Sequence, residues 1–135
     1  NEVAANGGNC LYGGGVQGPV RSGFAATSAS LRYNAGASFY GVMELSGNLW
    51  ERPVSVGNAT GRLFTGLSGD GVLDASGNAN VSLWPGTSAV GSGFRGGIWS
   101  SGTTYARVSD RAVAAYSGSA RYYDSGARCA RTSPE

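Results

Sequence analysis

Few side chains in this sequence could do acid–base chemistry, because the 135-residue chain has eight acidic residues and no histidine. Without imidazole, it lacks the commonest general base, a Ser-His-Asp triad and a histidine zinc site. Two carboxylate pairs could cooperate: Glu44 and Glu51 flank a turn, while Asp70 and Asp74 share a loop. No second feature supports either pair, so solvated or structural acids are favoured. We therefore expect a protein that is not an enzyme.

The thiol chemistry depends on two cysteines near opposite ends, Cys10 and Cys129. A disulfide between them would close a loop of about 120 residues and add on the order of 4–5 kcal/mol of stability in the chain-entropy model. We expect this disulfide, with two unrelated buried thiols as the alternative. A disulfide in a chain rich in glycine and serine and devoid of lysine fits a secreted or cell-surface protein.

The charges limit the classes of partner. All ten basic residues are arginines, scattered along the chain, and the net charge is only +2. There is no basic stripe of the kind that nucleic-acid binding requires, so we expect no nucleic-acid partner. No apolar run is long enough to span a bilayer and no signal peptide is recognisable. Since the chain begins at Asn1, we expect it to be part of a longer protein.

The elements that would position functional residues are short. With 24 glycines and 14 aromatic residues, the composition predicts a loop-rich folded domain whose core relies on aromatic rings. Strands are expected before the turn at 46–48 and at 93–99, with shorter ones at 10–12 and 126–131. Residues 57–92 should form a long ordered surface excursion. Three apolar side chains should pin this excursion: Phe64, Leu73 and Trp84.

Two stretches, 38–52 and 93–99, carry the most distinctive residues. The first, SFYGVMELSGNLWER, runs from apolar residues through a Ser46-Gly47-Asn48 turn to an indole and a carboxylate. The second, GFRGGIW, places Arg95 between Phe94 and two glycines, with Trp99 beyond. An arginine flanked by aromatic rings is predicted to be buried or stacked.

Four motifs occur in an order that resembles a known family. SGNLWER is followed by GFRGGIW, then by Arg107-x-x-x-Arg111, and then by GARCAR. This order is similar to that of the formylglycine-generating enzyme (sulfatase-modifying factor) family, over roughly 33–131. The resemblance implies an α+β fold, a C-type lectin-like domain of the formylglycine-generating-enzyme type. It would form a single domain over 1–135, with short strands, few short helices and much irregular structure.

The resemblance does not extend to the family's chemistry. Its enzymes oxidise a substrate cysteine with two cysteines that bind copper, and the matching positions here are close to Ser101 and Ala106. Neither offers the soft ligand that copper needs, so we expect no copper and no formylglycine-generating activity.

The family also has a calcium site at the turn that matches 46–51. Carried over, the ligands would be the carbonyls of Ser46, Gly47 and Leu49 and the side chain of Glu51. Hard oxygen ligands on a tight loop suit calcium. The resemblance thus implies a structural calcium ion, with an ion pair between Glu51 and an arginine such as Arg52 as the alternative.

The segment after the second motif has the composition of a binding surface. Residues 100–126 are mainly Ser, Thr, Gly, Ala, Tyr and Asp. Tyrosine supplies contact area at low entropic cost, and Ser and Gly supply adaptable contacts. A wet loop with core-facing tyrosines is the alternative. The predicted ligand-binding residues are Trp99, Ser100, Ser101, Thr103, Tyr105, Tyr116, Arg121, Tyr122, Tyr123 and Asp124.

These observations predict a non-catalytic extracellular binding or adhesion module for a protein or glycan ligand. One alternative is a structural subunit of a cell-surface or filament assembly, which would self-associate. Another follows from a second resemblance, to the variable proteins of diversity-generating retroelements, whose diversified residues lie between similar motifs. A degenerate enzyme is a third alternative and would need a cleft with perturbed carboxylates.

Overall fold

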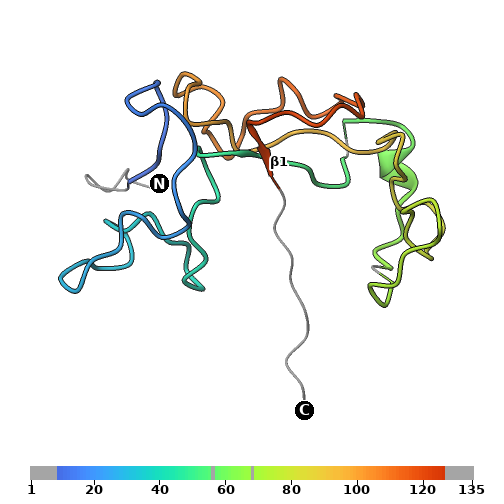
Figure 1. Ribbon diagram of the computed structural model, residues 1–135, viewed down its shortest axis with the longest axis horizontal. Coiled ribbons are helices and arrows are strands. Elements are labelled where there is room, and N and C mark those ends of the chain that lie inside the picture. Colours follow the sequence, from blue (N-terminus) through green and yellow to red (C-terminus); the bar gives the residue numbers. More distant parts are fainter. Residues whose placement is uncertain (1–8, 56, 68, 127–135) are drawn as a thin grey trace, which may run out of the picture. The chain divides into compact units, whose positions relative to one another are not determined.

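The computed structural model describes residues 9–55, 57–67 and 69–126 (Figure 1). The chain divides into two compact units, each assembled from two separate stretches. The first unit consists of Asn1–Leu49 and Gly96–Asp110, and the second of Trp50–Arg95 and Arg111–Glu135. Each motif stretch therefore contributes residues to both units.

Regular structure is sparse and lies in the second unit. Strand β1 (Trp50–Glu51) pairs in parallel with β2 (Ser125–Gly126), and Trp50 lies opposite Ser125 (Figure 1). The 3-10 helix η1 (Gly61–Leu63) is the remaining regular element of the described residues. In the same part of the chain, no helix is long and apolar enough to cross a membrane.

The predicted strand at 93–99 does not form. Instead, Ser92 and Arg95 each make a single antiparallel bridge, with Val54 and Glu51 respectively. The reason is local, because Gly96 and Gly97 have φ angles of 90° and 76°, in the left-handed region that ends a strand. The other end of the prediction, at Trp99, belongs to the first unit.

The other predicted strands are also shorter than expected. At 10–12, Leu11 makes one bridge with Gly47. The prediction of a strand in the apolar run before the 46–48 turn is wrong, because Gly41 and Glu44 have positive φ angles of 79° and 60°. The final predicted strand begins where β2 lies, and residues 127–131 are outside the described residues.

Backbone hydrogen bonds join the segments of the second unit. Glu51 and Arg95 exchange two bonds, each 3.0 Å long between nitrogen and oxygen. The Gly93 nitrogen donates to Pro53, and the Phe94 nitrogen donates to Val113. The chain around Gly93 therefore lies between two neighbours that are distant in sequence.

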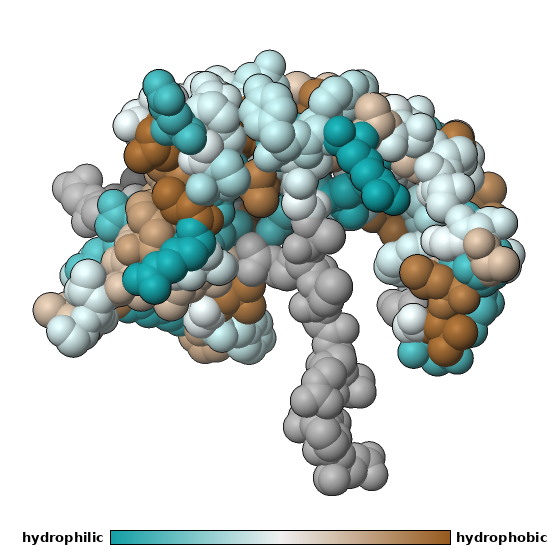
Figure 2. All heavy atoms as spheres, viewed as in Figure 1, coloured by the Kyte–Doolittle hydropathy of each residue, from teal (hydrophilic) through white to brown (hydrophobic). Residues whose placement is uncertain are grey.

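The core of the second unit is small. Phe94 is buried with Ala89 and Ala114, and its ring stacks on Tyr116 at a centroid distance of 5.3 Å. Phe94 also contacts Trp50, with centroids 5.9 Å apart. Phe94 is the only buried aromatic residue among the described residues, so the expected aromatic core is wrong for most of the rings. Many apolar side chains lie at the surface, as the brown spheres of Figure 2 show.

The excursion at 57–92 is ordered by turns and by one ring contact. Phe64 and Trp84 meet edge to face, with centroids 5.2 Å apart, as their predicted pinning role requires. Leu73 does not pin the segment, because its side chain is 61% exposed. Its backbone instead makes a bridge with Ala79, which closes the local loop.

Candidate functional site

The ten predicted ligand-binding residues fall in two sets, and each unit carries one of them. The first unit holds Trp99 to Tyr105, where the backbone anchors the segment. The backbone nitrogen of Trp99 donates to the Asn48 carbonyl, and the Trp99 carbonyl accepts from the Gly14 nitrogen. The Ser101 carbonyl accepts from the Gly13 nitrogen. Three side chains of this set lie at the surface: Ser100, Thr103 and Tyr105.

The second unit holds the other set, Tyr116 to Asp124. The Tyr122 hydroxyl hydrogen-bonds with that of Tyr116, which raises the pKa of Tyr122 above its usual value, and the Asp124 carboxylate adds to this. Tyr116 in turn stacks on the buried Phe94. Asp124 accepts a backbone hydrogen bond from Trp50 at 2.8 Å, beside β1. This set is therefore tied to the core through Tyr116.

The predicted tyrosines are exposed. Tyr122 and Tyr123 are 49% and 78% exposed, and Tyr105 and Tyr116 are 37% and 40% exposed. Core-facing rings were the alternative, and these exposed fractions count against it. Tyr116 combines both roles, because one face of its ring covers Phe94.

A cavity of about 470 Å³ lies beside this set, within the second unit. We call it the arginine cavity, because Arg52 and Arg121 both line it. The other lining residues are small or carry hydroxyl groups: Gly86, Thr87, Ala89, Ser119, Ala120, Tyr122, Ser125 and Gly126. No acidic side chain lines the cavity in the part of the chain that the structure describes. Of the predicted residues, the structure brings Arg121 and Tyr122 to this cavity.

Arg52 lines the arginine cavity, and the sequence interpretation did not include it among the ligand-binding residues. Its Nη1 donates to the Ser92 hydroxyl at 3.1 Å, and its Nη2 donates to the Gly118 carbonyl at 2.7 Å. Its guanidinium carbon lies 4.2 Å from the Phe94 ring centroid. Arg52 thus makes a ring contact of the kind predicted for Arg95, whose own Nη1 atom is buried. The adjacent bridge between Glu51 and Arg95 aligns Arg52 with the segment that carries Phe94. No sequence signal links these positions.

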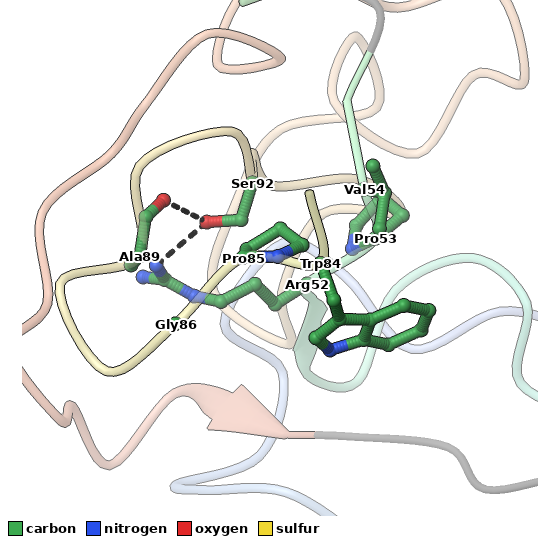
Figure 3. A pocket seen from close by; sticks show the side chains of 8 residues that line it. All are labelled: Arg52, Pro53, Val54, Trp84, Pro85, Gly86, Ala89 and Ser92. Carbon is green, nitrogen blue, oxygen red and sulfur yellow. Dashed lines mark hydrogen bonds between the residues drawn. The ribbon is translucent and has the colours of Figure 1, made fainter. Parts of the chain in front are cut away.

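A second cavity, of about 320 Å³, is also lined by Arg52 (Figure 3). It shares Arg52, Gly86 and Ala89 with the arginine cavity, and its remaining lining residues are Pro53, Val54, Trp84, Pro85 and Ser92. The Ser92 hydroxyl accepts from Arg52 and donates to the Ala89 carbonyl at 2.6 Å, the two dashed lines of Figure 3. Ser92 therefore helps to fix the position of Arg52, which lines both cavities.

The calcium ligands implied by the resemblance also divide between the units. Ser46, Gly47 and Leu49 belong to the first unit, and Glu51 belongs to the second. The expected turn is present, since Gly47 and Asn48 have φ angles of 74° and 65°. Among the described residues, no group of three or more His, Cys, Asp or Glu side chains could hold a metal ion. Calcium stays a prediction.

Of the two cysteines of the predicted disulfide, the structure describes Cys10. Cys10 is a free thiol whose sulfur donates to the Ser46 carbonyl at 3.0 Å. Burial raises the pKa of this thiol, and the charge of Glu44 adds to the effect. Cys129 lies outside the described residues, so the Cys10–Cys129 disulfide stays a prediction.

The carboxylates of the 70–80 loop serve its backbone. The Oδ1 of Asp70 accepts from the Val72 nitrogen and from the Asn80 amide, each at 2.9 Å. The Oδ1 of Asp74 accepts from the nitrogens of Ser76 and Asn78, each at 2.8 Å. These bonds agree with the structural role that was favoured for this pair.

Comparison with known proteins adds no relative. No family model, no curated protein and no solved structure matches this chain. The resemblance to the formylglycine-generating enzyme family and the C-type lectin-like fold therefore stay predictions from motifs.

Proposed function

We propose that the chain is a non-catalytic extracellular binding module that holds a protein or glycan ligand on the second unit. The ligand would contact Tyr116, Arg121, Tyr122, Tyr123 and Asp124, which we call the tyrosine surface. The observation that carries this proposal is the exposure of Tyr122 and Tyr123, at 49% and 78%, beside the 470 Å³ arginine cavity. Exposed tyrosines beside a concave site suit recognition of a ligand.

The tyrosine surface is partly preorganised. Tyr122 is held by its hydrogen bond with Tyr116, and Tyr116 is held by its stack on buried Phe94. A ring that is already positioned loses less conformational entropy when a ligand binds, so more of the contact energy appears as affinity. Tyr123 is 78% exposed, and the small residues Ser119 and Ala120 let a ligand approach closely.

The double substitution Tyr122→Ala/Tyr123→Ala tests the proposal. We expect wild-type protein to select ligands from a printed glycan array and a displayed peptide library, and the variant to lose them. The melting temperature should change little, because exposed side chains contribute little to stability. The matched control is Tyr33→Ala/Tyr40→Ala in the first unit, whose side chains are 50% and 86% exposed.

Two results would contradict the proposal. One is equal ligand selection by the wild type and the Tyr122→Ala/Tyr123→Ala variant. The other is a large fall in melting temperature for that variant, which would show that the two rings belong to the core. A loss of binding in the Tyr33→Ala/Tyr40→Ala control as well would show that binding is a general property of exposed tyrosines.

A further inference from the structure

We infer that the arginine cavity binds the oxyanion of an acidic sugar, through the guanidinium groups of Arg52 and Arg121. This inference rests on the proposed function and names the ligand class of the same site. It follows from three features of the cavity: its two arginines without a carboxylate among the described lining residues, the free donors of Arg52, and the size and chemistry of its walls.

Among the described residues that line the cavity there are two arginines and no carboxylate. Arg121 is exposed and makes no hydrogen bond or ion pair with a described residue, and the partners of Arg52 are a hydroxyl, a carbonyl and a ring. The nearest acid in this segment is Asp124, whose Oδ1 accepts from the Ser125 hydroxyl at 3.3 Å. Since Asp124 does not line the cavity, the two guanidinium groups favour an anion within it.

The guanidinium group of Arg52 has more N–H donors than its described hydrogen bonds use. A guanidinium group has five N–H donors, and neutral acceptors of the described residues use two of them. The guanidinium group is half-buried, so it has lost part of its hydration. Burying a charge costs free energy, and a bound anion would offset that cost. The two hydrogen bonds and the contact with Phe94 fix the plane of the Arg52 guanidinium group. The planar pair of N–H donors on such a group matches the geometry of a carboxylate or a sulfate.

The walls of the cavity favour a sugar over an acidic peptide. A volume of about 470 Å³ lies within the usual range of small-ligand sites. Thr87, Ser119 and Ser125 bring hydroxyl groups for sugar hydroxyls, and Tyr122 brings a ring. Gly86, Ala89 and Gly126 leave room for a compact ring. A peptide would instead need an extended edge or groove for its backbone.

Glucuronate and glucose test the inference, because they differ only in the oxidation state of C6. Binding would be followed by titration calorimetry and by shifts of arginine side-chain signals in nuclear magnetic resonance. We expect glucuronate to bind at least about tenfold more tightly than glucose, the usual effect of a charge-assisted hydrogen bond. Glucose 6-sulfate should also bind, because the shared chemistry is the oxyanion.

The variants separate site binding from general charge effects. Arg121→Gln and Arg52→Gln should each weaken glucuronate binding by about tenfold or more. Arg121→Gln is the primary variant, because Arg121 has no described contact whose loss would affect folding. Arg107→Gln, an exposed arginine of the first unit, changes the net charge equally and should leave the affinity unchanged.

Three outcomes would overturn the inference: equal affinity for glucose and glucuronate, an equal effect of Arg107→Gln and Arg121→Gln, or binding of an acidic peptide but not of glucuronate. Each leaves the proposed function standing if the Tyr122→Ala/Tyr123→Ala variant still loses ligands that the wild type selects. Glucuronate binding that is lost in Arg121→Gln but kept in the Tyr122→Ala/Tyr123→Ala variant would support the oxyanion contact with Arg121 and contradict a contact between the sugar and the Tyr122 ring.

Discussion

At the scale of single residues, Gly93 determines how closely two backbone segments approach. A Cβ atom at this position would overlap the Ala114 carbonyl group, with the carbonyl carbon only 2.6 Å away. The neighbouring nitrogen of Phe94 donates to Val113, and the Gly93 nitrogen donates to Pro53. A side chain at position 93 would therefore push apart the segments that hold Phe94, and with it the ring on which Arg52 stacks.

The substitution Gly93→Ala should lower the free energy of unfolding by about 1–3 kcal/mol, the usual cost of overpacking, because the atoms in the way are backbone. Urea denaturation followed by tryptophan fluorescence would measure the change. Gly102→Ala is the matched control, because a Cβ there meets no atom within 4 Å. Equal stabilities of the two variants would contradict the close approach at Gly93.

At the scale of elements, side-chain acceptors replace ladders of backbone hydrogen bonds. The loop at 70–80 shows this most clearly, since Asp70 and Asp74 each accept backbone N–H groups within it. A carboxylate that accepts hydrogen bonds is favoured in its charged form, so the bonds from Asn78, Ser76 and Gly77 lower the pKa of Asp74 below its usual value of 3.8. The loop is thus stabilised by a charge.

The lowered pKa of Asp74 predicts how the stability of the 70–80 loop depends on pH. Because the pKa of Asp74 is lower in the folded state, its contribution to stability is present above pH 3.8 and is lost as the pH falls through the folded value. Carboxyl-carbon nuclear magnetic resonance should give a midpoint below 3.8 for Asp74. In Asp74→Asn, the amide signals of Ser76 and Asn78 should lose their acid transition. A wild-type midpoint at or above 3.8 would contradict the described bonds.

At the scale of the whole molecule, many large apolar side chains lie at the surface (Figure 2). Phe39 and Tyr40 of the first unit are among the most exposed, and their rings contact each other edge to face. Large exposed apolar patches mark interaction sites, whereas scattered apolar side chains are ordinary. The proposed binding module and the alternative of a structural subunit therefore differ in how much the protein associates with itself.

The binding module should sediment as a monomer or a small oligomer, because the tyrosine surface has to remain free for its ligand. Sedimentation velocity over a wide range of protein concentration would measure this. The variant Phe39→Ser/Tyr40→Ser serves as control, since it removes the most exposed apolar pair of the first unit. Large assemblies that disappear in this variant would favour the structural subunit instead.

Several features followed from the sequence because they depend on neighbouring residues. The Ser46-Gly47-Asn48 turn is one, since glycine and asparagine adopt left-handed φ angles at low cost. The exposure of Tyr122 and Tyr123 was expected from their small and polar neighbours, but core-facing rings stayed an alternative until the structure gave the exposed fractions. The same local freedom explains the failed strands, because the glycines at 96 and 97 ended an element that apolar pattern alone had favoured.

The tertiary structure decided which arginine meets which ring and where a cavity forms. Arg52 lies over Phe94 and donates to Gly118, contacts that join segments far apart in the chain. The arginine cavity likewise combines Arg52, residues 86–89 and residues 119–126. No periodicity or motif encodes such pairings, because they depend on how distant backbone segments pack. The sequence by itself determined the turns and the composition of the surface, and packing determined the site.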